Sequence, residues 1–128
     1  MTKDEAIEEH RKLWNWLSKN PGAYKRDYFA KCYPDNYPIT NNCFLCAYLE
    51  ETYFPNEQLP CSDNRCILVW PNGGCQDSPL SEEYDSVYPM GLFDEWEREV
   101  RKFSPDYQLL CKLAAEIRDL PINSNSPY

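Results

Sequence analysis

The chain has 128 residues, a formal net charge of −8, and an aromatic content that includes four Trp and ten Tyr. This length predicts a single domain, and the many aromatic residues argue against a disordered chain. The negative charge opposes direct binding to nucleic-acid phosphates, which depends on clustered Lys and Arg, and no apolar run approaches the ~20 residues that span a bilayer.

The N-terminal sequence MTKDEAIEEH contains no apolar stretch of the kind found in secretory signals. We therefore expect a cytoplasmic protein, in a compartment where thiols stay reduced and clustered cysteines more often bind metal than form disulfides. The total of seven cysteines is odd, which also disfavours a complete disulfide framework.

The N-terminal region is predicted to be helical over residues 1–33. Thr2 and Glu5 have capping-box spacing, and an apolar face then recurs at helical period until about Asn20. That face consists of Ile7, His10, Leu13, Trp14, Trp16 and Leu17. A second short helix is expected to open at Asn20-Pro21 and to end near Pro34. Its shared face would hold Tyr24, Tyr28 and Cys32.

The middle of the chain, residues 41–91, is rich in cysteine and proline and predicts mostly irregular structure. After Cys46, the sequence AYLEETYF predicts a short helix that ends before Pro55. The apolar run CILVW at 66–70 predicts either a short strand or a buried turn. Residues 71–91 predict an irregular surface segment.

Two further helices are predicted over residues 91–120. The first has one apolar stripe, made of Leu92, Phe93, Trp96, Val100 and Phe103. Ser104-Pro105-Asp106 predicts the start of the second, with Ser104 as its cap and Pro105 at its first position. The second stripe consists of Leu110, Leu113, Ala114, Ile117 and Leu120. Pro121 should end the helix and leave a loose tail over 121–128.

The predicted fold class is therefore mainly α. We expect a small single helical domain with an irregular, metal-tied central segment and at most one short β element.

Five cysteines in the middle of the chain predict a structural Zn²⁺ site. Cys43 and Cys46 form a C-x2-C pair, which can supply two ligands of a zinc tetrahedron from one tight turn. Cys61, Cys66 and Cys75 compete for the remaining positions. A metal site of this kind stabilises a short chain with many prolines, because the free energy of metal binding adds to the free energy of folding.

Other uses of these thiols stay open: scattered free thiols, disulfides, a redox pair or an iron–sulfur cluster. A catalytic zinc is disfavoured because such sites usually include His or carboxylate ligands, and the chain has one His. The deaminase pattern fails because Cys61 is followed by x4. The flanks of Cys43 and Cys46 do not predict the βαβ setting of a thioredoxin-like pair. No phosphate-binding or hydrolase motif occurs, so we expect a non-enzymatic protein.

His10 lies on the apolar face of the first predicted helix, and we expect a core imidazole there. The alternative is a fourth metal ligand, if this helix packs on the cysteine region. As a catalytic base, His10 has no obvious partner in the sequence. Cys32 and Cys111 are predicted to be small core residues, since a buried Cys behaves as a small hydrophobe.

Several segments together resemble small cysteine-containing proteins of phages and prophages of Gram-positive bacteria. They are EAIEEHRKLWNWL, NNCFLCAY, CILVW, CQDSP and LAAEIRDLP. Proteins of this type tend to show C-x2-C, then C-x2-C-P-L-x-W, then one more Cys. The chain departs from that pattern in the x4 between Cys61 and Cys66 and in Ile67, where Pro is usual. The resemblance implies a phage origin and a metal knot, and it carries no assigned activity.

The sequence favours a phage accessory protein that acts by binding a host protein. In its sharper form, this hypothesis predicts an inhibitor of a host defence or nucleic-acid enzyme that occupies a basic groove of its target. Candidate contact residues are acids and aromatics: Glu82, Glu83, Tyr84, Asp85, Tyr88, Asp94 and Glu95. The alternative is a nucleic-acid-associated zinc module for phage replication or transcription, using aromatic stacking. The acidity is also compatible with a purely solubilising role.

Overall fold

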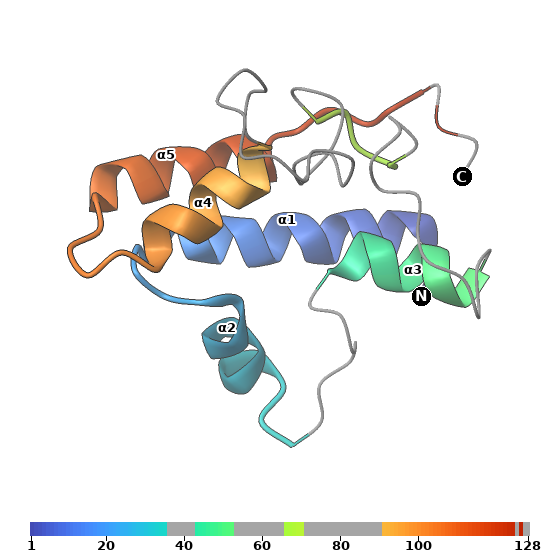
Figure 1. Ribbon diagram of the computed structural model, residues 1–128. Coiled ribbons are helices and arrows are strands. Elements are labelled where there is room, and N and C mark those ends of the chain that lie inside the picture. Colours follow the sequence, from blue (N-terminus) through green and yellow to red (C-terminus); the bar gives the residue numbers. More distant parts are fainter. Residues whose placement is uncertain (36–42, 53–65, 71–90, 125, 127–128) are drawn as a thin grey trace, which may run out of the picture.

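The computed structural model describes residues 1–35, 43–52, 66–70, 91–124 and 126 (Figure 1). These residues form five α-helices: α1 (Lys3–Lys19), α2 (Lys25–Cys32), α3 (Phe44–Thr52), α4 (Leu92–Val100) and α5 (Tyr107–Arg118). The described part is mainly helical, which confirms the predicted fold class. None of its helices is both long and apolar enough to cross a bilayer.

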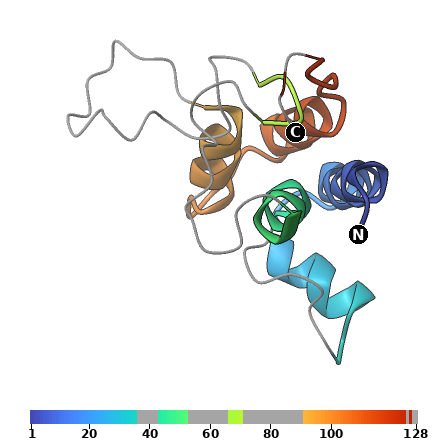
Figure 2. The same ribbon diagram turned by 90° about the vertical axis from the view of Figure 1, so that its right-hand side faces the viewer.

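Helix α1 lies at the centre of the arrangement. It packs against α5, α3 and α2, and α4 packs on α5. Figure 2 shows α1 and α5 side by side, with α3 against α1 and α2 at the far end of the molecule from α5. All five helices contribute to one hydrophobic cluster, and so do Ile67, Leu68 and Trp70. An aromatic group at its centre joins Trp14 of α1 to Trp96 of α4, with ring centroids 4.9 Å apart.

Helix α1 forms as its sequence pattern predicts. The side chain of Thr2 accepts a hydrogen bond from the Glu5 backbone N–H at 3.2 Å, and Asn20 caps the C-terminus. The predicted apolar face is turned to the core, except that Trp16 is only half-buried. His10 is among the buried residues, with 3% of its surface exposed.

Helix α2 begins later than the sequence predicts. Pro21 does not open it, because Gly22 adopts a positive φ of 92° and turns the chain before Lys25. A side chain at Gly22 would also meet the ring of Tyr107, whose Cε1 lies 3.0 Å from the ideal Cβ position. The turn therefore favours glycine for its backbone conformation, and any other residue would also have to displace the Tyr107 ring slightly.

One prediction for the inner face of α2 needs correction. Cys32 is exposed rather than a core residue, although its thiol lies beside the buried Tyr28, as the shared face predicts. Cys111, the other expected core thiol, is only half-buried in α5. Helix α3 forms where a short helix was predicted, although it begins at Phe44, before Cys46 rather than after it.

The turn between α4 and α5 differs from the prediction at both of its ends. Phe103 does not continue the apolar stripe of α4 and is fully exposed, since α4 ends at Val100. The N-cap of α5 is Asp106 rather than Ser104, and its carboxylate accepts the Leu109 N–H at 3.1 Å. The buried carboxylate of Glu99 accepts the Asp106 N–H at 2.8 Å and so fixes this start.

The run at 66–70 is partly a β element. Leu68 forms an isolated antiparallel bridge with Ile122. Two backbone hydrogen bonds flank the bridge, from Val69 N to Pro121 O at 2.9 Å and from Asn123 N to Ile67 O at 2.7 Å. The start of the expected loose tail, Pro121–Asn123, is thus paired with the centre of the chain. The predicted irregular segment before residue 91 lies outside the described residues.

Candidate functional site

Cys43 and Cys46 lie at the N-terminal end of α3. The Cys43 carbonyl accepts the Ala47 N–H at 2.9 Å, and the Cys46 N–H points back to Cys43 Sγ at 3.3 Å. Phe44 and Leu45, between the two cysteines, are almost fully buried and anchor this turn in the core. Both sulfur-bearing side chains remain half-buried at the surface.

This geometry gives the Cys43 sulfur a backbone N–H donor at the start of a helix. Backbone N–H groups at a helix N-terminus, together with the positive end of the helix dipole, stabilise a negative sulfur. A thiolate is the form that binds metal, and N–H···S bonds of this kind orient a metal ligand. The donor set at Cys43 and Cys46 therefore fits two ligands of a zinc site.

Cys66 opens the 66–70 segment and, like Cys43, packs against the core cluster. Its Sγ accepts a hydrogen bond from the Trp70 indole N–H at 3.3 Å, and its carbonyl accepts the Asn123 side-chain amide at 3.1 Å. Ile67 and Leu68 hold the segment in the core. The position of this thiol is therefore fixed by both the centre and the C-terminal end of the chain.

The described cysteines do not complete a metal site among themselves. Within residues 1–35, 43–52, 66–70, 91–124 and 126, no group of three or more His, Cys, Asp or Glu side chains could hold an ion. Cys61 and Cys75 lie outside the described residues. Cys32, Cys43, Cys46, Cys66 and Cys111 are present as thiols. Two predicted ligands thus lie at one helix end, and a third lies in the separate 66–70 segment.

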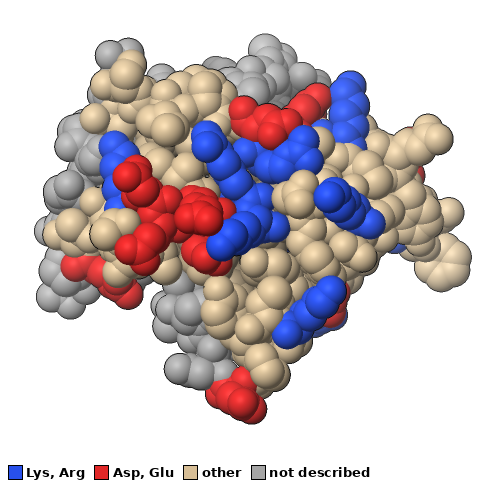
Figure 3. Space-filling view, turned by 180° about the vertical axis from the view of Figure 1, so that it is seen from behind, with Lys and Arg blue, Asp and Glu red and all other residues tan. Residues whose placement is uncertain are grey.

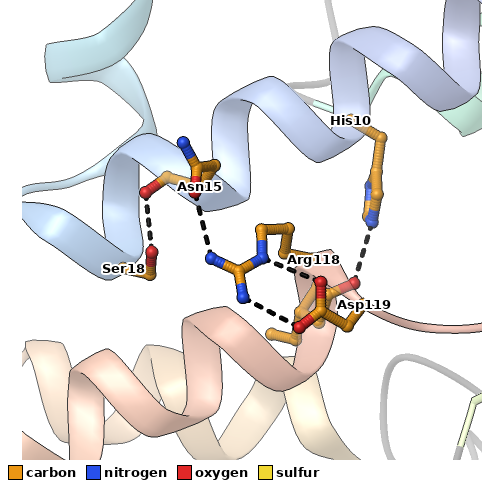
Figure 4. A network of polar contacts seen from close by, with 6 residues as sticks. His10, Asn15, Ser18, Arg118 and Asp119 are labelled. Atoms are coloured by element: carbon orange, nitrogen blue, oxygen red, sulfur yellow. Dashed lines mark hydrogen bonds and ion pairs between the residues drawn. The ribbon is translucent and has the colours of Figure 1, made fainter.

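His10 occupies a structural position between helices. Its Nε2 lies 3.3 Å from the backbone oxygen of Ile117, which joins α1 to the end of α5 (Figure 4). A carbonyl only accepts, so Nε2 is the protonated nitrogen of a neutral ring. The pKa of His10 is lowered to about 4, chiefly by burial; the hydrogen bond to Ile117 opposes this shift, and the positive charges of Lys25 and Arg11 add to it. The expectation of a core imidazole is confirmed.

A polar network lies beside His10 on the same two helices. Arg118 donates to both carboxylate oxygens of Asp119 at 2.8 Å and to the side-chain oxygen of Asn15 at 3.0 Å (Figure 4). The paired guanidinium lowers the pKa of Asp119, and the carboxylate raises that of Arg118. Ser18 adds a hydrogen bond to the Asn15 carbonyl at 2.7 Å. The network joins the C-terminal end of α5 to the middle of α1.

Most of the predicted partner contacts lie outside the described residues. These are Glu82, Glu83, Tyr84, Asp85 and Tyr88. Of the remaining two, Asp94 is half-buried and Glu95 is exposed, both in the first turn of α4. Among the described residues, the two predicted contacts therefore share the first turn of α4.

The acidic charge of the chain is unevenly distributed along the sequence. Segments 53–65 and 71–90 hold one Arg and six acids, a net charge of −5 out of the total of −8. The six acids are Glu57, Asp63, Asp77, Glu82, Glu83 and Asp85. The rest of the chain carries a net charge of only −3. The negative charge is thus concentrated between and beyond the central cysteines.

Comparison with known proteins finds no matching family model, no matching curated protein and no matching solved structure.

An open groove of about 560 Å³, which the sequence does not predict, lies between α1 and the end of α5. It is lined by Asp4, Ile7, Glu8, Arg11, Lys12, Asn15, Arg118, Asp119 and Ile122. Apart from Ile7, which belongs to the predicted apolar face, the α1 members could be assigned to the polar side of a predicted helix. Their meeting with residues 118–122 depends on a tertiary contact that no local pattern encodes.

Proposed function

We propose that the protein is a non-enzymatic, zinc-stabilised phage accessory protein that acts in the cytoplasm of a bacterial host by binding a host protein. The observation that carries this proposal is the concentration of acidic charge in the segments 53–65 and 71–90, beside the cysteines expected to bind zinc. A localised negative field attracts a basic partner and speeds its association. A basic nucleic-acid-binding enzyme, including one that serves host defence, is the type of target that this charge fits best.

The helical frame supports the proposal by serving as a scaffold. Cys43 and Cys66 are each fixed to the core by buried neighbours, at Phe44 and Leu45 and at Ile67. A metal held by such anchored thiolates would limit the freedom of the chain between them and lower the entropy lost on binding a partner. In this role the ion supplies stability alone, because an all-cysteine site leaves no open position for a reactant.

A pulldown from lysate of a Gram-positive host tests the proposal. The tagged wild-type chain should retain one host protein, and retention should fall as salt concentration rises because exposed charges are screened. A triple variant, Glu82→Lys, Glu83→Lys and Asp85→Lys, should lose that protein.

The matched control places the same charge change on exposed acids outside the acidic segments, through Asp35→Lys, Glu51→Lys and Glu116→Lys. It should retain the host protein. Equal loss from both triple variants would show that only net charge matters and would contradict a localised surface. Retention by the first variant, or no retained protein with the wild type, would also contradict the proposal. Salt-sensitive binding of the purified chain to DNA or RNA would favour the nucleic-acid module instead.

A further inference from the structure

A short open β edge lies beside the α1–α5 groove. In the antiparallel bridge between Leu68 and Ile122, the hydrogen bonds are made by the flanking residues and not by this pair. The N–H and C=O of Ile122 must therefore point away from the 66–70 segment. Neither group forms a hydrogen bond in the described structure, and half of the Ile122 surface is exposed. Ile122 also lines the groove, so the edge borders it.

The groove is lined by two apolar residues and by three acids and three cations, of which Asp4 and Arg11 form no ion pair with any described side chain. Ile7 and Ile122 contribute the apolar surface. Arg118 is committed to Asp119 and Asn15, and Lys12 is paired with Glu8 at 3.3 Å. Arg11 forms no ion pair or hydrogen bond with any described side chain, although its charge helps to lower the pKa of Asp119. Figure 3 shows Lys and Arg side chains gathered beside acidic ones on the face behind that of Figure 1.

These features together define a surface for an extended peptide. We propose that a partner protein docks an extended segment in this groove by adding a strand to the Ile122 edge, with an apolar side chain over Ile7 and Ile122 and a carboxylate facing Arg11. Strand addition supplies main-chain hydrogen bonds for affinity, and side-chain pockets supply specificity. An unpaired strand edge is a ready template for this mode of pairing.

The occupant follows from charge and shape. The end of a partner helix, or a free anion, could pair with Arg11. Neither would form hydrogen bonds with the Ile122 backbone or cover the apolar surface of Ile7 and Ile122. An extended segment with a carboxylate uses all three. This surface lies on α1 and α5, away in sequence from the acidic segments, so the inference stands or falls separately from the proposed function.

Selection of short random peptides against the full-length protein tests the proposal. Enriched peptides should combine an acidic residue with a branched apolar residue. Arg11→Glu should weaken a selected peptide about 10-fold or more, the usual size of a lost charge-assisted hydrogen bond. Lys112→Glu, the same charge change at an exposed position of α5 outside the groove, should leave affinity within about two-fold, as expected of a remote surface charge.

N-methylated versions of the selected peptide separate strand addition from simple charge attraction without altering the protein. Methylation should abolish binding at the position that donates to Ile122 and be tolerated at its neighbours, because alternate N–H groups of a strand face opposite edges. The proposal is overturned if no peptide is enriched, if Arg11→Glu leaves affinity unchanged, or if every methylated peptide binds like the parent. Binding of oligo-dT with the same Arg11 dependence, and no enriched peptide, would assign the groove to nucleic acid and also overturn it.

Discussion

His10 and Ile117, 107 positions apart in the sequence, meet across the α1–α5 interface, where His10 Nε2 lies 3.3 Å from the Ile117 backbone oxygen. The ring also packs near Trp14 and Trp70, with centroids 6.4 Å away in each case. A buried neutral imidazole thus links α1, the end of α5 and the segment that begins at Cys66.

This link predicts a loss of stability in mild acid. The pKa of His10 in the folded protein, about 4, lies below the ordinary value of 6.5. The neutral ring therefore contributes its full share of the unfolding free energy above pH 6.5, and this share is lost as the pH falls towards 4. The full loss should approach roughly 3 kcal/mol. Urea denaturation between pH 7 and 4.5 measures it. His10→Gln keeps an N–H donor and cannot titrate, so its stability should fall less over this range; equal slopes would contradict the account.

The corrected position of Phe103 predicts a contrast between two aromatic residues. Trp96 is buried against Trp14, so Trp96→Ala should cost about 3–5 kcal/mol of unfolding free energy. Phe103 is fully exposed, and Phe103→Ala should change stability by no more than about 0.5 kcal/mol. Thermal and urea unfolding measure both. A large cost for Phe103→Ala would mean that the apolar stripe of α4 does continue to this residue.

The start of α5 predicts a similar contrast between two caps. Asp106→Ala removes the side chain that accepts the Leu109 N–H and should cost about 1 kcal/mol. Ser104, which the sequence pattern favoured as the cap, is exposed and outside the helix. Ser104→Ala should therefore be nearly neutral in the same denaturation measurement, and the reverse order would restore the sequence-based assignment.

The sequence predicts the long helices well because their stability comes from a repeating apolar face. The stripes of α1 and α5 are local patterns, and the predicted second stripe is buried as expected: Leu110, Leu113, Ala114, Ile117 and Leu120. The helix starts are less predictable because several residues could act as caps. Asp106 rather than Ser104 is the N-cap because the carboxylate of Glu99 accepts the Asp106 backbone N–H. Pro21 lies outside α2 because Gly22 forms a turn after it.

The candidate site is predictable only in part for the same physical reason. The C-x2-C pair is contiguous, so the turn that holds Cys43 and Cys46 follows from local chemistry. The groove beside Ile122 and the pairing of Pro121–Asn123 with Ile67–Val69 join residues that are far apart in the chain. Such contacts are set by packing of the whole core and leave no local signature.

The cysteines themselves yield a prediction with an internal control. Cys43→Ser should lower bound zinc and reduce the thermal stability of the whole chain, because one metal ligand and its share of folding free energy are lost. Cys32→Ser, at an exposed thiol outside the central cysteine set, should leave both unchanged. Metal content and melting temperature of the two variants, measured side by side, check this. A fall in zinc with Cys32→Ser, or an unchanged melting temperature with Cys43→Ser, would count against the assignment.

Metal stoichiometry tests the central claim most directly. The full-length protein, purified without chelator under reducing conditions, should carry one tightly held zinc ion per chain by elemental analysis and by native mass spectrometry. Chelation at neutral pH should remove the ion and lower the melting temperature. A chain that folds and stays stable with no transition metal would contradict the account, and the central cysteines would then have to be explained as reduced thiols of a purely hydrophobic fold.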